Sequence, residues 1–391
     1  MNASGVVSLF QLMLGFGAGT FGAWWSLLSV LAVPAARGRA SKPGLRFVAV
    51  VPAHNEEALI AATVDSVSSA PYHPRPEVLV VADNCTDATA SVARSRGATV
   101  VARQDSAHLG KSFALDFAIT QLRSREAAPP DVVVVVDADT TVGPSFFEAL
   151  AAAMEESPIA QARYDAAPSS SELGRLRRLA LALVHHARPL GAQRLGLPTT
   201  LKGNGMAFRW DVVREGIPGS GITEDAAATL DLAARGLCVR YVPDARIAGL
   251  MAEGYQQAMT QDSRWEGGRF ALIPRALWVF CKGLARGQLR SAAAAAEVAS
   301  PPLTLVGMGA ATALLLGLAG FGSWRLGIAS VLSVFSYVGM GLLAARADRS
   351  DLMALIGAPR FVGHKFVAFG GVIRSRPKEW ERTERGGGVP E

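Results

Sequence analysis

The chain has few cysteines and histidines, and none of them is spaced like a metal centre or a disulfide framework. Of its 391 residues, three are cysteine and six are histidine. Cys85, Cys238 and Cys281 form no Cys-x-x-Cys pair, and an odd number argues against a set of disulfides. No zinc-finger spacing and no basic strand interleaved with aromatics is present, so the net charge of +6 does not indicate nucleic-acid binding. The middle of the chain therefore suits a reducing cytoplasm.

Charge is absent from three stretches of the chain. Residues 1–36 contain no Asp, Glu, Lys or Arg, and about 20 apolar residues are enough to span a bilayer. A cleaved signal peptide would need a basic start and a short apolar core, so we interpret 1–36 as a transmembrane segment. Residues 298–324 and 326–345 are also uncharged, with Arg325 between them. We predict two transmembrane helices over 298–346, giving three spans.

Basic residues next to these segments predict the orientation. Arginines and lysines follow residues 1–36 and recur in the tail, and the positive-inside rule places such flanks in the cytoplasm. We expect a multi-pass protein of the inner or plasma membrane with a cytoplasmic domain over 46–268. Residues 269–297 mix apolar and basic side chains and are predicted to be interfacial, and 351–391 to form an interfacial helix and a basic tail. Amphipathic helices packed on the cytoplasmic domain are the alternative.

Apolar strands alternate with helical segments after residue 46. The predicted strands are 46–53, 77–82, 98–103, 131–136 and, less regularly, 159–164, and the predicted helices are 56–70, 86–97 and 110–125. Continuous apolar strands alternating with helices are typical of a parallel sheet covered on both faces. We therefore expect a mostly parallel α/β sheet whose carboxyl strand ends form one ligand-binding edge.

Acidic side chains follow several of these strands. The first is followed by Glu56, the second by Asp83 and the fourth by Asp137 and Asp139. One helix needs only one N-terminal cap, so a single acid can be a cap but this pair is better explained by a cation. Mg²⁺ or Mn²⁺ binds one or two carboxylates and fills its remaining positions with water and phosphate oxygens. The sequence therefore predicts a Mg²⁺ or Mn²⁺ site on Asp137 and Asp139.

Two later motifs are weaker when taken alone. Gly203 and Asn204 lie in "KGNG", whose composition suits a tight turn with its backbone close to a ligand. Glu224 and Asp225 are predicted in the first turn of a helix, where acids also simply compensate the helix dipole. A carboxylate on such a rigid element can serve as a general base.

The ordered motifs resemble those of the family-2 inverting glycosyltransferases, most closely the membrane-bound branch with cellulose, chitin, hyaluronan and poly-N-acetylglucosamine synthases. The matching segments, within residues 46–290, are "VVPAHNEE", "VVADNCTD", "LGKSFAL", "VVVDADTTV", "KGNGMAFR", "ITEDAAATLDLAARG" and "QDSRWEGGR". The order Asp-x-Asp, Thr-Glu-Asp, Gln-x-x-Arg-Trp is the most specific part. The resemblance implies a GT-A fold, a nucleotide-sugar donor, with UDP favoured, and Mg²⁺ or Mn²⁺.

The resemblance also implies roles for individual residues. Asp225 matches the catalytic base, and Arg264 matches the arginine that binds the leaving diphosphate. Asp137 and Asp139 match the acids that hold the metal. The substrate-binding residues implied in this way are Glu56, Asp83, Lys111, Asp137, Gly203, Asn204, Glu224, Gln261 and Trp265.

We expect a glycosyltransferase that acts with inversion on a membrane-associated glycan or lipid acceptor. The alternative is a processive polysaccharide synthase of the same family, although three spans are few for an export channel. A non-catalytic membrane scaffold is a third reading, which the intact motifs disfavour. A nucleotidyltransferase would need a glycine-rich phosphate loop that "PAHNEE" lacks. The expected partners are the nucleotide-sugar donor, the acceptor and membrane lipids, with no nucleic acid and an export partner left open.

Overall fold

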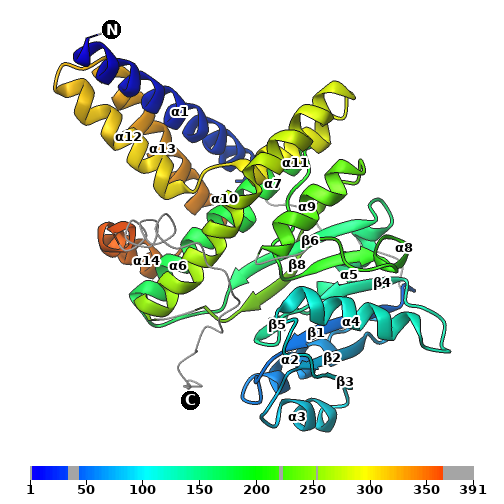
Figure 1. Cartoon of the computed structure of the whole chain (residues 1–391). Helices are drawn as coiled ribbons and strands as arrows, with labels where there is room; N and C mark the ends of the chain where they lie inside the picture. The colour runs from blue at the N-terminus through cyan, green and yellow to red at the C-terminus, as the bar shows by residue number, and fades with distance from the viewer. Residues whose placement is uncertain (1, 34–43, 220–222, 252–253, 364–391) are drawn as a thin grey trace. The chain divides into compact units, whose positions relative to one another are not determined.

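The computed structural model describes residues 2–33, 44–219, 223–251 and 254–363 (Figure 1). The chain divides into two compact units, which are described separately. Of the described residues, 2–33, 169–196 and 300–363 form the helical unit, and 44–168 and 197–299, apart from the gaps given above, form the sheet unit. Residues 169–196 thus group with the apolar helices, although the sequence placed them inside the domain over 46–268.

One eight-stranded sheet forms the centre of the sheet unit, in the order β3-β2-β1-β4-β7-β6-β8-β5. The strands are β1 (Phe47–Ala53), β2 (Glu77–Asp83), β3 (Thr99–Arg103), β4 (Val132–Val135), β5 (Thr140–Val142), β6 (Ile159–Ala166), β7 (Met206–Arg209) and β8 (Arg240–Gly249). Strands β1 to β4 are parallel. Strand β7 is antiparallel to β4 and β6, β6 is parallel to β8, and β5 is antiparallel to β8.

The expectation of a mostly parallel sheet is therefore wrong, because the sheet is mixed. It holds for the half built from β1 to β4, where a helix connects each strand to the next one along the chain. Beyond β4 the regular alternation stops, and β7 follows the short loop that contains Gly203 and Asn204.

Helices cover both faces of the sheet. Helices α2 (Ile60–Ser68), α3 (Thr89–Ser95) and α5 (Phe146–Met154) pack on one face, and α4 (Lys111–Arg123), α8 (Trp210–Val213) and α9 (Glu224–Ala234) pack on the other. Alternate side chains of β1 enter the two cores, with Val51 on the α2 side and Val50 on the α4 side. The valine run Val132–Val136 is fully buried, as a central strand requires.

Two further helices complete the sheet unit. Helix α10 (Tyr255–Ala285) and α11 (Leu289–Ala299) pack together against α9. The contact is formed by small and branched side chains such as Ala276, Val279 and Ala295 around Leu230. The boundary predicted between residues 268 and 269 lies inside α10.

The helical unit contains α1 (Ala3–Ala32), α6 (Glu172–Ala182), the π-helix η1 (Leu183–Ala187), α7 (Arg188–Arg194), α12 (Leu303–Leu318), α13 (Trp324–Ala345), α14 (Arg349–Ala354) and η2 (Leu355–Gly357). Among the described residues, α1 and α13 are each long and apolar enough to cross a membrane. A third span is counted only if α11 and α12 are taken as one broken span. The predicted residues 364–391 of the basic tail lie outside the described part of the chain.

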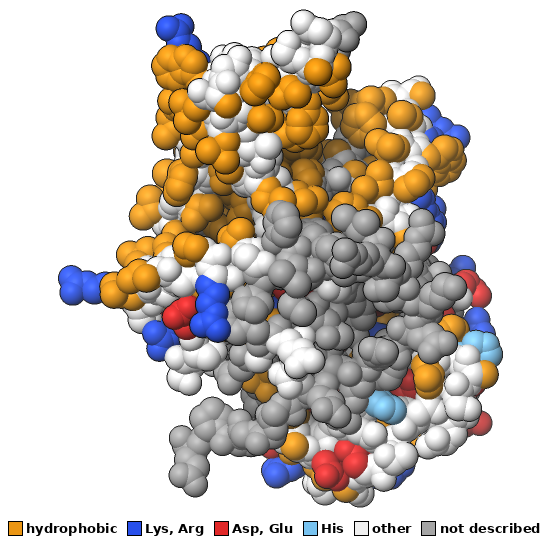
Figure 2. Space-filling view, turned by 60° about the vertical axis from the view of Figure 1, so that its left-hand side comes forward, with side chains coloured by type: hydrophobic (Ala, Val, Ile, Leu, Met, Phe, Trp, Pro, Cys, Tyr) orange, Lys and Arg blue, Asp and Glu red, His pale blue; other side chains and the backbone are white. Residues whose placement is uncertain are grey.

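Close contacts between small residues hold the apolar helices together. A Cβ added at Gly327 of α13 would lie 2.5 Å from the Cα of Leu314 in α12, so glycine permits this approach. The buried amide of Gln11 in α1 donates to the carbonyls of Ala313 and Ser323, both at 2.9 Å. Large apolar side chains remain exposed on these helices (Figure 2).

Candidate active site

Lys111 joins two of the predicted motifs. Its Nζ donates to Oδ1 of Asp137 and to the carbonyl of Gly203, both at 2.5 Å. The same ammonium lies 4.0 Å from a carboxylate oxygen of Glu224. The residues come from the start of α4, the end of β4, the loop before β7 and the start of α9. A single cation therefore lies among motifs separated by up to about a hundred residues of sequence.

Asn204 holds the turn that carries Asp137 and Asp139. Its Oδ1 accepts from the backbone N–H of Asp137 at 3.1 Å, and its Nδ2 donates to Oγ1 of Thr140 at 2.9 Å. The Thr140 hydroxyl in turn donates to Oδ1 of Asp139 at 3.1 Å. Asn204 is fully buried, so its side chain acts on the acidic turn and positions it.

The same turn is also held by α2 and, through the loop of Asn204, by β6. Thr63 of α2 donates its hydroxyl hydrogen to the carbonyl of Ala138 at 2.7 Å and accepts from the N–H of Thr140 at 3.2 Å. Buried Gln161 of β6 binds the loop of Asn204 by donating to its carbonyl at 2.8 Å and accepting from the N–H of Lys202 at 2.9 Å. The acidic turn is thus fixed by polar groups on three separate elements.

Asp225 lies next to this cluster. Gly203 has φ of +77°, and a Cβ built on it would lie 3.6 Å from Oδ2 of Asp225 and 3.9 Å from Nζ of Lys111. Thr229, one turn along α9, donates to the carbonyl of Asp225 at 2.9 Å. The structure therefore brings the acid pair, the glycine loop and the carboxylate predicted as the base into one region of the sheet edge.

Burial governs the ionisation of these groups. It raises the pKa of Asp225, an effect opposed by the N–H of Ala226 and by nearby cations. Burial also raises the pKa of Glu224 to about 7, although Lys111 opposes the shift. For Lys111, burial alone would lower the pKa, but the carboxylates of Asp137 and Glu224 outweigh it and raise the pKa. The ammonium therefore stays charged beside the acids.

The Gln-x-x-Arg-Trp motif lies on α10 within the sheet unit. Gln261 is buried and Trp265 is half-buried, whereas the side chain of Arg264 lies outside the described part of the structure. One turn further, a Cβ on Gly268 would lie 2.5 Å from Cγ2 of Thr223, the residue just before α9. This close approach anchors α10 at the start of the helix that carries Asp225.

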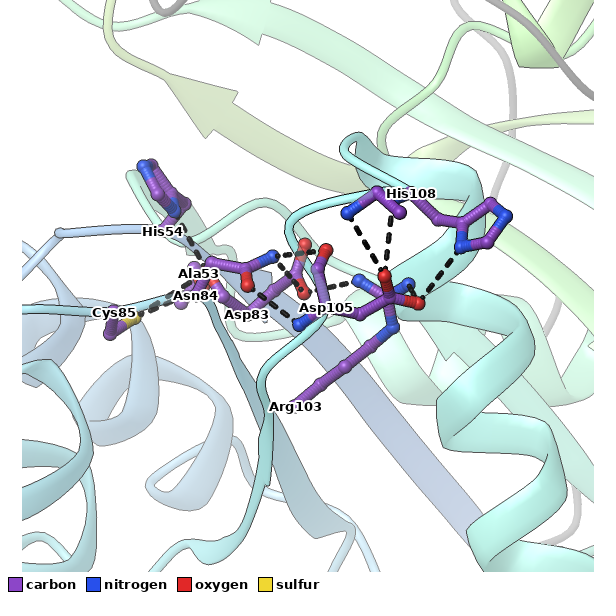
Figure 3. Close-up of polar contacts among 9 residues, drawn as sticks. Ala53, His54, Asp83, Asn84, Cys85, Arg103, Asp105 and His108 are labelled. Atoms are coloured by element: carbon purple, nitrogen blue, oxygen red, sulfur yellow. Dashed lines mark hydrogen bonds and ion pairs between the residues drawn. The ribbon is translucent and has the colours of Figure 1, made fainter.

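A second polar cluster occupies the ends of β1, β2 and β3 (Figure 3). Asp83 forms an ion pair with Arg103 at 2.7 Å, and both side chains are about nine-tenths buried. Arg103 also contacts Asp105 at 2.9 Å, and His108 contacts the same carboxylate at 3.0 Å. The hydrogen bond from His108 is the largest cause of the lowered pKa of Asp105. The Nδ1 of His54 lies 2.7 Å from the carbonyl of Asp83.

Glu56, also predicted to bind substrate, lies in the loop after β1. Its N–H donates to Oγ1 of Thr89 at 2.7 Å, while the N–H of neighbouring Glu57 donates to Asp87 at 3.1 Å. Glu56 and Asp83 thus lie at the carboxyl ends of adjacent parallel strands. Arg103 and Asp105 were not predicted from the sequence, although polar residues at the end of the third strand are the same signal that identified Asp83.

The described acids offer only part of a metal coordination shell. No group of three or more His, Cys, Asp or Glu side chains in the described ranges could hold a metal ion alone. The pair Asp137 and Asp139 still fits a divalent ion by its chemistry, because two carboxylates lie two residues apart in one turn and Mg²⁺-type sites need only one or two such protein ligands.

Comparison with known proteins places this arrangement in a family. Residues 43–268 match the family described as "Glycosyltransferase like family 2", and no curated protein matches the chain. A mannosyltransferase from Pyrobaculum calidifontis, in complex with GDP-mannose and Mn²⁺, has a TM-score of 0.56 at 17% identity and covers 94% of this chain and 99% of that one. Glucosyl-3-phosphoglycerate synthase from Mycobacterium tuberculosis, in complex with UDP, has a TM-score of 0.42 at 24% identity and covers 59% of this chain and 80% of that one. The family match spans more than half of the sequence, and the chain belongs to glycosyltransferase family 2.

Proposed function

We propose that this glycosyltransferase transfers a sugar, with inversion, from a nucleoside-diphosphate sugar to a membrane-associated glycan or lipid acceptor. The observation that carries the proposal is the chain of contacts from Asp137 through Lys111 to Gly203, with Asp225 beside Gly203. It unites the groups needed at the leaving diphosphate with a carboxylate suited to the attacking hydroxyl. Asp225 is the general base in this proposal.

The chemistry is a single displacement at the anomeric carbon. The acceptor oxygen forms a bond to that carbon while the bond to the diphosphate oxygen breaks, which inverts the configuration. The hydroxyl proton passes to Asp225, whose raised pKa makes it a better proton acceptor than an exposed aspartate. Negative charge grows on the departing diphosphate, and the ammonium of Lys111 is placed to offset it. A Mg²⁺ or Mn²⁺ ion on Asp137 and Asp139 would supply further positive charge there.

The nucleotide is assigned to the edge formed by β1, β2 and β3. Glu56 and Asp83 lie there, and the buried ion pair of Asp83 with Arg103 fixes the carboxylate for binding a base or ribose. The family resemblance alone favours UDP, while the mannosyltransferase of similar fold was solved with GDP-mannose. A panel of UDP- and GDP-sugars with Mg²⁺ or Mn²⁺, scored by the diphosphate released, decides the donor.

The span-length helices α1 and α13 support an acceptor at a membrane. Transfer of one sugar to such an acceptor is our first choice. Processive synthesis of an exported polymer is the alternative, because Gln-x-x-Arg-Trp occurs on α10. Product length after a single encounter separates the two: a ladder of long products indicates processivity, and a single added sugar indicates stepwise transfer.

Asp225→Asn tests the assignment of the base. The variant should keep donor binding and lose about 10²- to 10⁴-fold in turnover, the range for removing a general base. Asp231→Asn is a matched control on the same helix, because Asp231 contacts Arg275 and lies outside the cluster. Near-normal transfer by Asp225→Asn would remove Asp225 from its role.

A further inference from the structure

Two buried threonines on different helices of the sheet unit use their hydroxyl groups in the same way. Thr63 of α2 and Thr229 of α9 are each 1% exposed. Each hydroxyl donates to one backbone carbonyl and accepts from one backbone N–H. A hydroxyl buried this deeply is expected to be bonded, but the backbone groups that these two bind belong to different parts of the candidate active site.

Thr63 bonds the backbone of the acidic turn at a point where the sheet does not. The pairing of β4 with β1 ends at Val135, and β5 begins at Thr140. Between these strands, the hydroxyl of Thr63 donates to the carbonyl of Ala138 at 2.7 Å and accepts from the N–H of Thr140 at 3.2 Å. These two backbone groups lie on either side of Asp139. Thr63 therefore fixes the stretch of backbone from which the Asp139 carboxylate projects.

The direction of the Thr63 hydroxyl is itself informative. A threonine inside a helix commonly bonds the carbonyl four residues before it, and Thr229 does so with the carbonyl of Asp225 at 2.9 Å. Thr63 instead donates to a carbonyl 75 residues away in the sequence. Ser66, one turn further along α2, accepts from the N–H of Val142 in β5 at 3.3 Å. Helix α2 is thus fastened to the acidic turn and to the strand that follows it.

Thr229 links the helix of the proposed base to the glycine loop. Its hydroxyl accepts from the N–H of Leu201 at 3.0 Å while it donates to the carbonyl of Asp225. Leu201 lies two residues before Gly203, and a Cβ built on Gly203 would lie 3.6 Å from Oδ2 of Asp225. The Thr229 hydroxyl therefore sets how closely the loop and the Asp225 carboxylate approach each other.

We propose that Thr63 and Thr229 are positioning residues with separate tasks. Thr63 holds the acidic turn in the conformation that binds the divalent ion, and Thr229 holds Asp225 at its working distance from the glycine loop. The inference rests on the proposed function, which supplies the metal site and the base. Residues that orient metal ligands change metal affinity by about 10- to 100-fold. Misplacing a reacting group by about 1 Å costs up to about 10²-fold in turnover.

Thr63→Val and Thr229→Val form a matched pair of variants, because valine keeps the branched shape and removes the hydroxyl. Mn²⁺ is titrated into the purified full-length chain with UDP or GDP present, and free Mn²⁺ is counted by electron paramagnetic resonance against a protein-free blank. Turnover is the release of diphosphate from the nucleotide sugar that the parent uses, recorded over a range of Mn²⁺ concentrations.

The two variants should fail in different ways. Thr63→Val should bind Mn²⁺ about 10- to 100-fold more weakly and regain most of its turnover when Mn²⁺ is saturating. Thr229→Val should bind Mn²⁺ as the parent does and stay below the parent in turnover at every Mn²⁺ concentration. Unchanged Mn²⁺ affinity in Thr63→Val, parental turnover in Thr229→Val, or an equal loss of Mn²⁺ affinity in both would overturn the division of tasks.

Serine variants separate positioning from a general loss of stability. Thr63→Ser and Thr229→Ser keep the hydroxyl, so they should keep parental Mn²⁺ affinity and turnover. If a valine variant does not fold, serine and alanine are compared at that position, since both lack the methyl group and only serine can bond. Equal Mn²⁺ affinity in Thr63→Ala and Thr63→Ser, or equal turnover in Thr229→Ala and Thr229→Ser, would refute the task of that threonine.

Failure of the proposed function gives a different result. If the parent and Asp139→Ala bind Mn²⁺ equally, the metal site itself is wrong and the task of Thr63 falls with it. If the parent binds Mn²⁺ more tightly than Asp139→Ala while Thr63→Val matches the parent, the metal site stands and the inference about Thr63 alone is wrong.

Discussion

Replacing Asn204 by alanine should weaken metal-dependent activity without removing any residue assigned to the metal or the substrate's reacting atoms. The side chain of Asn204 is fully buried, and it bonds the N–H of Asp137 and the hydroxyl of Thr140. Asp137 belongs to the acidic turn, and Thr140 follows it directly. Removing the amide therefore frees Thr140, which orients Asp139, and leaves the N–H of Asp137 without its acceptor.

The structure sets the size of the effect. A buried N–H left without an acceptor costs about 1–3 kcal/mol, and the second lost hydrogen bond about 0.5–1.5 kcal/mol. We expect the sheet unit to lose about 2–4 kcal/mol of unfolding free energy. Residues that orient metal ligands typically change metal affinity by about 10- to 100-fold. The Mn²⁺ concentration that half-saturates activity should rise by that factor.

Activity is measured against Mn²⁺ concentration, with thermal unfolding recorded in parallel. Leu150→Ala is the control, because Leu150 is a fully buried core residue of α5 and its truncation costs a comparable 2–5 kcal/mol or so. It should lower stability and leave the Mn²⁺ requirement unchanged. If Asn204→Ala destabilises the protein as Leu150→Ala does but keeps the parental Mn²⁺ requirement, the positioning role is refuted.

Three further changes probe the same site. Glu224→Gln should remove a pH dependence of stability. Burial raises the pKa of Glu224 from 4.5 to about 7, so the unfolding free energy of the parent falls as the pH rises between these values, and the variant should gain on the parent by at most about 3 kcal/mol between pH 5 and pH 8. The same difference between variant and parent at both pH values would contradict this. Gly268→Ala should lower turnover, because its Cβ would meet Thr223 at 2.5 Å, and added Thr223→Ala should restore part of it; no loss in the single variant would count against the contact. Asp139→Ala should abolish metal-dependent donor binding in a calorimetric titration, and unchanged donor affinity would exclude Asp139 as a metal ligand.

The first half of the sheet could be predicted because its signals are local. The strands β1 to β4 and helices α2 to α4 agree with the segments expected from apolar runs and turn residues, with shifted ends. Val132–Val136 is a clear case, since a run of five valines is fully buried on both sides. Periodicity is read over a few residues, so it identifies such elements well.

The hydrophobic periodicity of the sequence could not predict which distant segments pair. The sequence of residues 206–209 carries no signal that this strand pairs with β4 in the antiparallel direction. Residues 169–196 were equally ambiguous, because a basic apolar helix can pack on a sheet or on other helices. Here Arg188 lies over the ring of Trp25 at 4.6 Å, a contact with a residue more than 160 positions away.

The direction of β7 explains why the glycine loop reaches the acidic turn at all. In a fully parallel sheet, a loop that precedes a strand lies at the edge opposite the carboxyl ends of its neighbours, so "KGNG" would have been far from Asp137. Because β7 is antiparallel to β4, with Met206 paired to Val135, the start of β7 meets the end of β4. Asn204 can then bond the N–H of Asp137, and the carbonyl of Gly203 can accept from Lys111. The departure from a parallel sheet is therefore the structural condition for the site.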